Sequence, residues 1–408
     1  MGLSEVLSRW AVRRCHVLVV EVPGATGQRI AVERAVAARA WVLARSPAEA
    51  DVLAVCGHPG PQMREAIARV WEQLPGPRTR VDVVVPEKAD AALDAASSAL
   101  LQEAPHREDA RSRTDAGAQE HDTDHEESGH GDTDHEESGH GDMDDGDMDH
   151  GDMDHGDMDH GDMDHGDMDH GDMDMPMPGG IGLASGRRDR DGLEMDVLHV
   201  PLGPVLPHWP AGLVLTCTLQ GDVVVEAGAE LLDPGEDLGG PGTGDPRRDV
   251  LVARCDAVAR LLAVAGWDSA ADQATRVRDR CLDGVPLAEC AAAVERLARR
   301  VTRSRSLRWS LRGSSIPTGP GGLEGVELLD RVLDWLEQAR VAGQAPAGPA
   351  ELGGEVTGEG TGEGVTRWGA ERVSLEALSD LVSGLDLAAV RLVVAGVAVV
   401  GEKQVADA

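Results

Sequence analysis

The chain has 408 residues and a formal net charge of −35, from 38 Lys and Arg against 73 Asp and Glu. Most of the excess is local, because residues 121–175 contain 23 acidic residues and no basic residue, which leaves −12 (−35 + 23) for the rest of the chain. This acidic balance disfavours nucleic acid as a partner. A chain of this length normally forms two or more domains, and its 41% hydrophobic content is enough for buried cores.

The aromatic content is unusual, because eight Trp are the only aromatic residues and Phe and Tyr are absent. Asn is absent as well, and Arg outnumbers Lys by 36 to 2. All the depleted residues have AT-rich codons, so the pattern is typical of a very GC-rich genome, such as that of a high-GC actinobacterium. Without Tyr, no phenol hydroxyl is available for catalysis or ligand binding.

The N-terminus lacks the basic start and apolar core of a signal peptide, and the longest apolar run, 392–400, is far shorter than the roughly 20 residues of a membrane helix. The six cysteines include no Cys-x-x-Cys pair, which argues against a zinc ribbon or a redox dithiol, so we expect buried structural thiols. These features predict a cytoplasmic protein that is at most peripheral on the inner face of the plasma membrane.

Residues 1–102 alternate between short apolar runs and helical patterns, which predicts an α/β N-terminal domain with a small parallel sheet. A Pro-Gly turn follows the first run, and Pro61 is well suited to open a helix. The expected strands are 16–22, 51–56 and 81–85, and the expected helices are 28–44, 61–73 and 87–101.

Residues 103–192 are expected to form a disordered acidic linker. A nine-residue His-containing motif occurs twice, and Gly-Asp-Met-Asp-His then repeats five times from 146 to 170. The repeats contain no Leu, Ile, Val or aromatic residue to offset the entropy of ordering.

Residues 193–408 are expected to form an α+β, mostly helical C-terminal domain. A strand pattern at 195–200 and a hairpin over 212–226 precede helical patterns, and a flexible Gly/Pro/Glu loop is expected at 342–365. The expected helices are 248–265, 268–283, 286–303 and 323–341, followed by a last helix and an apolar strand.

Residues 46–57, Met63 and 68–78 resemble the cluster-bearing small subunit of respiratory NADH-quinone oxidoreductase (complex I) and nickel-iron hydrogenases. Residues 202–213 and 219–224 are similar to the N-terminal hairpin of the large, quinone-site subunit of complex I, and 393–402 are similar to its C-terminus. The resemblance implies a shortened fusion of the two subunits.

The ligand positions depart from this family pattern. Where the family carries cysteines for a [4Fe–4S] cluster, this chain has Ala25 and Gln28, and a cubane needs about four thiolates. The hairpin histidines of the family fall near Leu206 and Pro210 or Ala211, which leaves His208 as the nearby imidazole, and the quinone-binding Tyr has no counterpart. The departures predict no catalytic residue, no cofactor-binding residue and no [4Fe–4S] cluster.

Two other groups of side chains are candidates for binding. Arg303, Arg305, Arg308 and Arg312, with Trp309 between them, form a basic cluster that suits either an acidic partner or lipid headgroups, unless it is only a solvated helix face or a contact with the chain's own acidic linker. The repeat offers imidazole, thioether and carboxylate ligands for Ni, Cu or Zn, unless it is only a tether expanded by replication slippage. The candidate metal ligands are His121, His125, His130, His135, His140, Met143, Met148, His150, Met153, His155, Met158, His160, Met163, His165, Met168, His170 and Met173.

The sequence therefore favours a non-catalytic structural or assembly component of a complex I-like or hydrogenase-like assembly, with that assembly's membrane subunits as partners. One alternative is a metal-binding protein that buffers or delivers Ni, Cu or Zn through the repeat. A second alternative is an active oxidoreductase subunit of the NADH-quinone oxidoreductase type.

Overall fold

The computed structural model describes residues 14–123, 185–188, 194–234, 242–311, 315–317, 325–345 and 372–400. Residues 1–110 and 181–408 belong to one compact unit, and residues 111–180 form another. The expected α/β segment and the expected C-terminal domain therefore pack together within one unit. Almost all of the predicted metal repeat lies outside the described residues.

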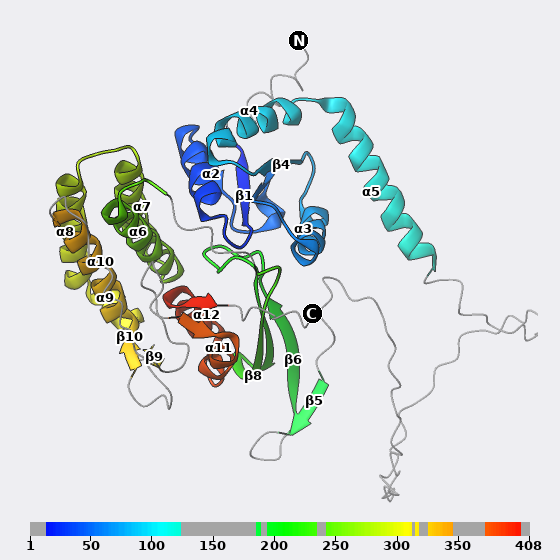
Figure 1. Ribbon diagram of the computed structural model, residues 1–408. Coiled ribbons are helices and arrows are strands. Elements are labelled where there is room, and N and C mark those ends of the chain that lie inside the picture. Colours follow the sequence, from blue (N-terminus) through cyan, green and yellow to red (C-terminus); the bar gives the residue numbers. More distant parts are fainter. Residues whose placement is uncertain are drawn as a thin grey trace, which may run out of the picture. The chain divides into compact units, whose positions relative to one another are not determined.

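The N-terminal segment is a parallel four-stranded sheet in the order β2-β1-β3-β4, covered by helices (Figure 1). Strand β1 pairs in parallel with β3, from Val17 opposite Val52 to Glu21 opposite Cys56. Every residue of β3 is buried, as expected for a central strand of a parallel sheet. The elements are β1 (His16–Glu21), α2 (Thr26–Ala38), β2 (Val42–Leu43), η2 (Pro47–Glu49), β3 (Val52–Cys56), α3 (Pro61–Gln73), β4 (Thr79–Val83), η3 (Pro86–Lys88), α4 (Ala89–Leu100) and α5 (Glu103–Thr123).

The sheet confirms the predicted small parallel α/β segment, with two differences. The helix expected over 28–44 ends at Ala38, because Ala40 takes a left-handed φ of 54° and Val42–Leu43 then pair with β1. Residues 103–123, expected to begin the linker, form helix α5, in which Arg107 pairs with Glu103 one turn earlier.

A second, antiparallel sheet opens the C-terminal segment, in the order β5-β6-β7-β8. The turn between its last two strands contains Gly221, whose φ of 63° suits a tight hairpin. The last strand continues to Leu231, five residues beyond the predicted 226, and its pairing with β7 shifts between Thr218 and Leu219. The strands are β5 (Ser185–Arg188), β6 (Glu194–Leu202), β7 (Leu213–Gln220) and β8 (Val223–Leu231).

The rest of the described C-terminal segment is mostly helical, as predicted, and α6 packs against both α7 and α10 (Figure 1). Asp245 caps the start of α6 by accepting a hydrogen bond from the Arg247 amide at 3.0 Å. The helices are α6 (Pro246–Val264), α7 (Asp268–Leu282), α8 (Leu287–Arg303), α9 (Arg305–Ser310), α10 (Leu328–Gln344), α11 (Leu375–Val382) and α12 (Leu387–Gly396). Short strands β9 (Ser315–Pro317) and β10 (Gly325–Glu327) pair antiparallel, and β11 (Arg372–Ser374) and β12 (Ala398–Val400) pair parallel.

The end of β8 reaches into the N-terminal segment. Leu232 is buried in the hydrophobic core of the parallel sheet rather than in that of the helices. Its neighbour Asp233 accepts a hydrogen bond from the Met63 amide at 2.7 Å, in the first turn of α3. Since Gly60, at the N-cap of α3, has no side chain to do this, the helix receives its cap from a residue 170 positions away.

No helix in the described residues is both long and apolar enough to cross a membrane.

Candidate functional site

The strand order of the parallel sheet points to the carboxyl ends of β1 and β3. Connections from these two adjacent strands run in opposite directions across the sheet, and ligands of such sheets bind at this switch point. The loop that follows β1, residues 22–25, and Gly57, which follows β3, lie here. The loop includes Ala25, one of the two positions that the resemblance assigns to cluster thiolates.

Both of those positions are used by the fold. Ala25 is buried against Gly57, where a Cβ atom added to the glycine would lie 2.7 Å from the Ala25 Cβ. Gln28, in the first turn of α2, donates a hydrogen bond from Nε2 to the Val84 carbonyl oxygen at 3.0 Å. These two side chains therefore pack the switch point and tie α2 to the end of β4.

The cysteines of the N-terminal segment lie in its core. Burial, assisted by the charge of Asp51, raises the pKa of Cys15 to about 12. Burial also raises the pKa of Cys56 above its ordinary value. A thiol ligates a metal as thiolate, so both environments oppose metal binding. In the described part of the chain, no three His, Cys, Asp or Glu side chains are gathered in a way that could hold a metal ion.

A buried network of charged side chains occupies the site beside this loop. Arg29, in α2, makes three ion pairs: its Nε lies 2.8 Å from Glu21, its Nη1 2.6 Å from Glu33 and its Nη2 2.6 Å from Asp256. Arg278, in α7, contacts the other oxygens of Glu33 and Asp256 at 2.7 Å each. Two arginines and two carboxylates thus alternate, and each carboxylate bridges both guanidinium groups.

The electrostatics of the network follow from this alternation. Burial alone would raise the pKa of Asp256, but the charges of Arg29 and Arg278 outweigh it and hold that pKa well below its usual range. The pKa of Glu33 is lowered for the same reason. The pKa of Arg278 is raised because Glu33 and Asp256 outweigh the cost of its burial. All four groups are therefore charged at neutral pH, and the network joins α2 to α6 and α7.

His208 lies within electrostatic reach of this network, in the loop between β6 and β7. It has a left-handed φ of 61°, and the next residue, Trp209, is buried and donates from Nε1 to the Leu213 carbonyl at 2.8 Å. Arg260 holds the loop by donating to the Trp209 carbonyl oxygen at 2.7 Å. The loop is thus fixed by its own tryptophan and by α6.

The imidazole of His208 is neutral at pH 7. Its side chain is exposed, and desolvation by the surrounding protein, followed by the charge of Arg260, lowers its pKa from 6.5 to about 4. Glu33 acts in the opposite direction and Arg29 in the same direction. A neutral imidazole can donate or accept a hydrogen bond here, but it carries no charge to attract an anion.

The other predicted site residues are placed as follows. His121 falls near the end of α5, whose bounds are Glu103–Thr123, and the metal candidates from His125 to Met173 lie outside the described residues. In the basic cluster, Arg303, Arg305 and Arg308 are exposed on α8 and α9, Trp309 is exposed beside them, and Arg312 lies outside the described residues. The structure thus brings part of the basic cluster together.

The network is the feature that sequence reasoning missed. Its only local signal is the spacing of Arg29 and Glu33, four residues apart on α2. The two contacts that join the segments, Arg29 with Asp256 and Arg278 with Glu33, link residues more than 200 positions apart. A pattern of spacings cannot detect such a pair.

No family model, curated protein or solved structure matches this chain. The resemblance to complex I and hydrogenase subunits therefore stays a prediction from the motifs.

Proposed function

We propose that the chain is a non-catalytic structural or assembly component of a membrane-associated assembly of the complex I or hydrogenase type. In this proposal its N-terminal segment derives from the small, cluster-bearing subunit and its C-terminal segment from the large, quinone-site subunit. Its partners are the membrane subunits of that assembly.

One observation carries the proposal: a buried network of ion pairs beside the switch point of the parallel sheet holds the two segments to each other. Arg29 and Glu33 come from the N-terminal segment, and Asp256 and Arg278 come from the C-terminal segment. The network makes a buried contact beside the loop to which the resemblance assigns cluster ligands. Such a contact suits a scaffold better than a reaction centre.

The test is co-purification of the tagged full chain from mild-detergent extracts of its native host, with partners identified by mass spectrometry. We expect membrane subunits of a complex I-like or hydrogenase-like assembly, both for the wild-type chain and for a chain lacking residues 121–177. Recovery of only the proteins found with an untagged control would overturn the proposal.

The second candidate function is binding of Ni, Cu or Zn by the repeat, favoured by ten His and eight Met within residues 121–175. Imidazole and thioether groups suit these metals, although a site that is not preorganised binds with modest affinity. Titration calorimetry should then detect metal binding by the full chain and not by the chain lacking 121–177. A host phenotype that disappears with the deletion would favour this function over a scaffold role.

An active oxidoreductase subunit is the third candidate. It requires a redox group in the isolated protein, so anaerobic purification followed by iron, sulfide and visible-absorbance measurements tests it directly. Iron and sulfide in stoichiometric amounts would overturn the scaffold proposal and establish an electron carrier.

A further inference from the structure

A basic surface lies on α8 and α9, away from the charged network. We call it the arginine face and define it by Arg296, Arg299, Arg300, Arg303, Arg305 and Arg308, all of which are exposed. They follow one another at helical spacing along α8 and continue into α9. In a chain of net charge −35, such a concentration of positive charge is a local exception.

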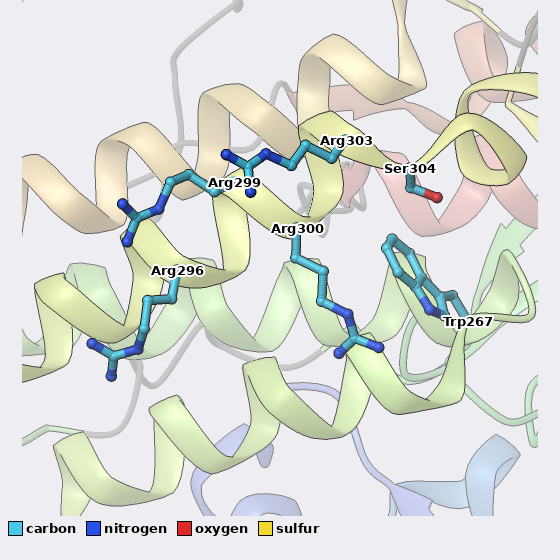
Figure 2. A pocket seen from close by; sticks show the side chains of 6 residues that line it. All are labelled: Trp267, Arg296, Arg299, Arg300, Arg303 and Ser304. Atoms are coloured by element: carbon cyan, nitrogen blue, oxygen red, sulfur yellow. The ribbon is translucent and has the colours of Figure 1, made fainter.

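The surface is hollowed. Arg296, Arg299, Arg300 and Arg303 line a groove of about 560 Å³ together with Trp267 and Ser304. Figure 2 shows the four arginine side chains projecting from α8, with Trp267 beside the end of the Arg300 side chain. The Arg300 guanidinium lies 5.0 Å from the centre of the Trp267 ring and donates to Ser269 and Gln273. Arg300 is thus held in place without being neutralised.

Most of this charge is uncompensated. Within the described residues, Arg296, Arg303 and Arg305 form no ion pair. Arg299 forms one long pair with Glu295, at 3.9 Å, and both side chains are exposed. Exposed pairs of this kind bind weakly and leave both groups open to other partners. The groove therefore presents guanidinium donors that fit phosphate oxygens.

An exposed tryptophan adjoins the charge. Trp309, in α9, is 77% exposed, whereas Trp209 and Trp335 are buried in the core. Tryptophan concentrates at the interface between water and lipid, where its apolar ring and its polar N–H group are both accommodated. Arginines with a neighbouring exposed indole match the composition of surfaces that lie on a membrane.

We propose that the arginine face binds the phosphate headgroups of an anionic phospholipid bilayer, with the Trp309 ring in the interface. A bilayer contacts only one face of the molecule. Because the screening length at physiological salt is about 8 Å, acidic surfaces further than this from the bilayer repel it only weakly. The inference extends the proposed function to a lipid contact. It does not depend on that function, because no partner protein takes part.

The experiment is sedimentation of the full chain with vesicles of phosphatidylcholine, alone or mixed with phosphatidylglycerol. Each arginine near an anionic surface contributes about fivefold to partitioning, so replacing Arg296, Arg303 and Arg305 by Gln should reduce it by about a hundredfold. The matched control replaces the exposed Arg64, Arg69 and Arg80 by Gln and should retain nearly wild-type binding. Trp309→Ala should reduce binding by about tenfold.

The outcomes separate the lipid from other anions. Equal binding to neutral and anionic vesicles, or an equal loss in both triple variants, overturns the proposal. Displacement from anionic vesicles by inorganic phosphate more effectively than by chloride at the same ionic strength also overturns it, in favour of a site for free phosphate. Circular dichroism of each variant verifies that the fold is retained. Since the vesicles contain no protein, failure here leaves the partner-recovery experiment unaffected.

Discussion

At the scale of single residues, the buried network depends most on the carboxylates that bridge both arginines. Asp256 bridges two guanidinium groups, so its charge compensates part of each. Removing a bridging carboxylate takes one ion-pair partner from each of two buried guanidinium groups, which costs far more than the net stabilisation that a buried pair provides.

We therefore predict that Asp256→Asn lowers the free energy of unfolding by about 3–5 kcal/mol. Urea unfolding followed by tryptophan fluorescence measures the change. Asp268→Asn is the matched control, because Asp268 also pairs with an arginine, Arg45, but both side chains are exposed. An equal loss in both variants would mean that burial does not determine the value of these pairs.

The neutral His208 imidazole gives stability a dependence on pH. Its pKa is about 4 in the folded chain against about 6.5 when unfolded, so between these values the unfolded state binds more protons. Stability from this group is present above pH 6.5 and is lost as the pH falls towards 4, and it is small because solvent screens the exposed side chain.

We predict that His208→Asn removes this part of the pH dependence, because Asn does not titrate and tolerates a left-handed backbone. The measurement is the urea midpoint of both proteins at pH 7 and pH 5. Between pH 7 and pH 5, the urea midpoint of the wild type should fall further than that of the variant. Parallel losses would contradict a depressed His208 pKa.

At the scale of elements, helix α3 illustrates what sequence can and cannot predict. Its bounds, Pro61–Gln73, match the prediction, because a Pro-Gly-Pro break and a helical apolar spacing are both local. Its cap, Asp233, lies at the end of a strand in another segment and has no local signal. The early end of α2 has the same origin, since pairing of Val42–Leu43 with β1 outweighs helix propensity.

The cap is open to a double-mutant test. Asp233→Ala should cost about 2 kcal/mol: about 1 kcal/mol for the lost N-cap, and about 1 kcal/mol because Ala tolerates the left-handed φ of 43° at this position less well than Asp. Gly60→Ala should cost about 1 kcal/mol, because its Cβ would lie 2.3 Å from the Asp233 Cγ and displace the carboxylate. In the Asp233→Ala background, Gly60→Ala should be nearly neutral. Additive costs in thermal or urea unfolding would show that the glycine acts independently of the cap.

At the scale of the whole molecule, composition and periodicity predicted the parallel sheet and the helical C-terminal segment. They did not predict that the two segments share one compact unit. That arrangement depends on contacts such as Arg29 with Asp256, which are separated by 227 positions and become neighbours only when both segments are folded. The candidate site was predicted only in part for the same reason. The ligand positions Ala25 and Gln28 could be located from local motifs, whereas the network beside them depends on contacts between segments that are distant in sequence.

Deletion of residues 121–177 should not destabilise the rest of the chain, because that interval lies outside the compact unit formed by residues 1–110 and 181–408. Shortening a connection by this much lowers the entropic cost of closure by about 1–2 kcal/mol, so the urea midpoint should stay constant or rise slightly. A lower midpoint would show that the deleted residues stabilise the unit directly.

The six cysteine thiols are all buried and none is in a disulfide, so their reaction with a thiol reagent reports local opening of the fold. Two precede or end strands of the parallel sheet and four lie in the C-terminal segment, so a maleimide can reach each one only when its own surroundings open. Mapping the alkylated cysteines by mass spectrometry over time would show whether the two segments open together or separately. The native surface meanwhile presents no competing thiol, so the Trp309→Cys variant would accept a dye selectively at that position.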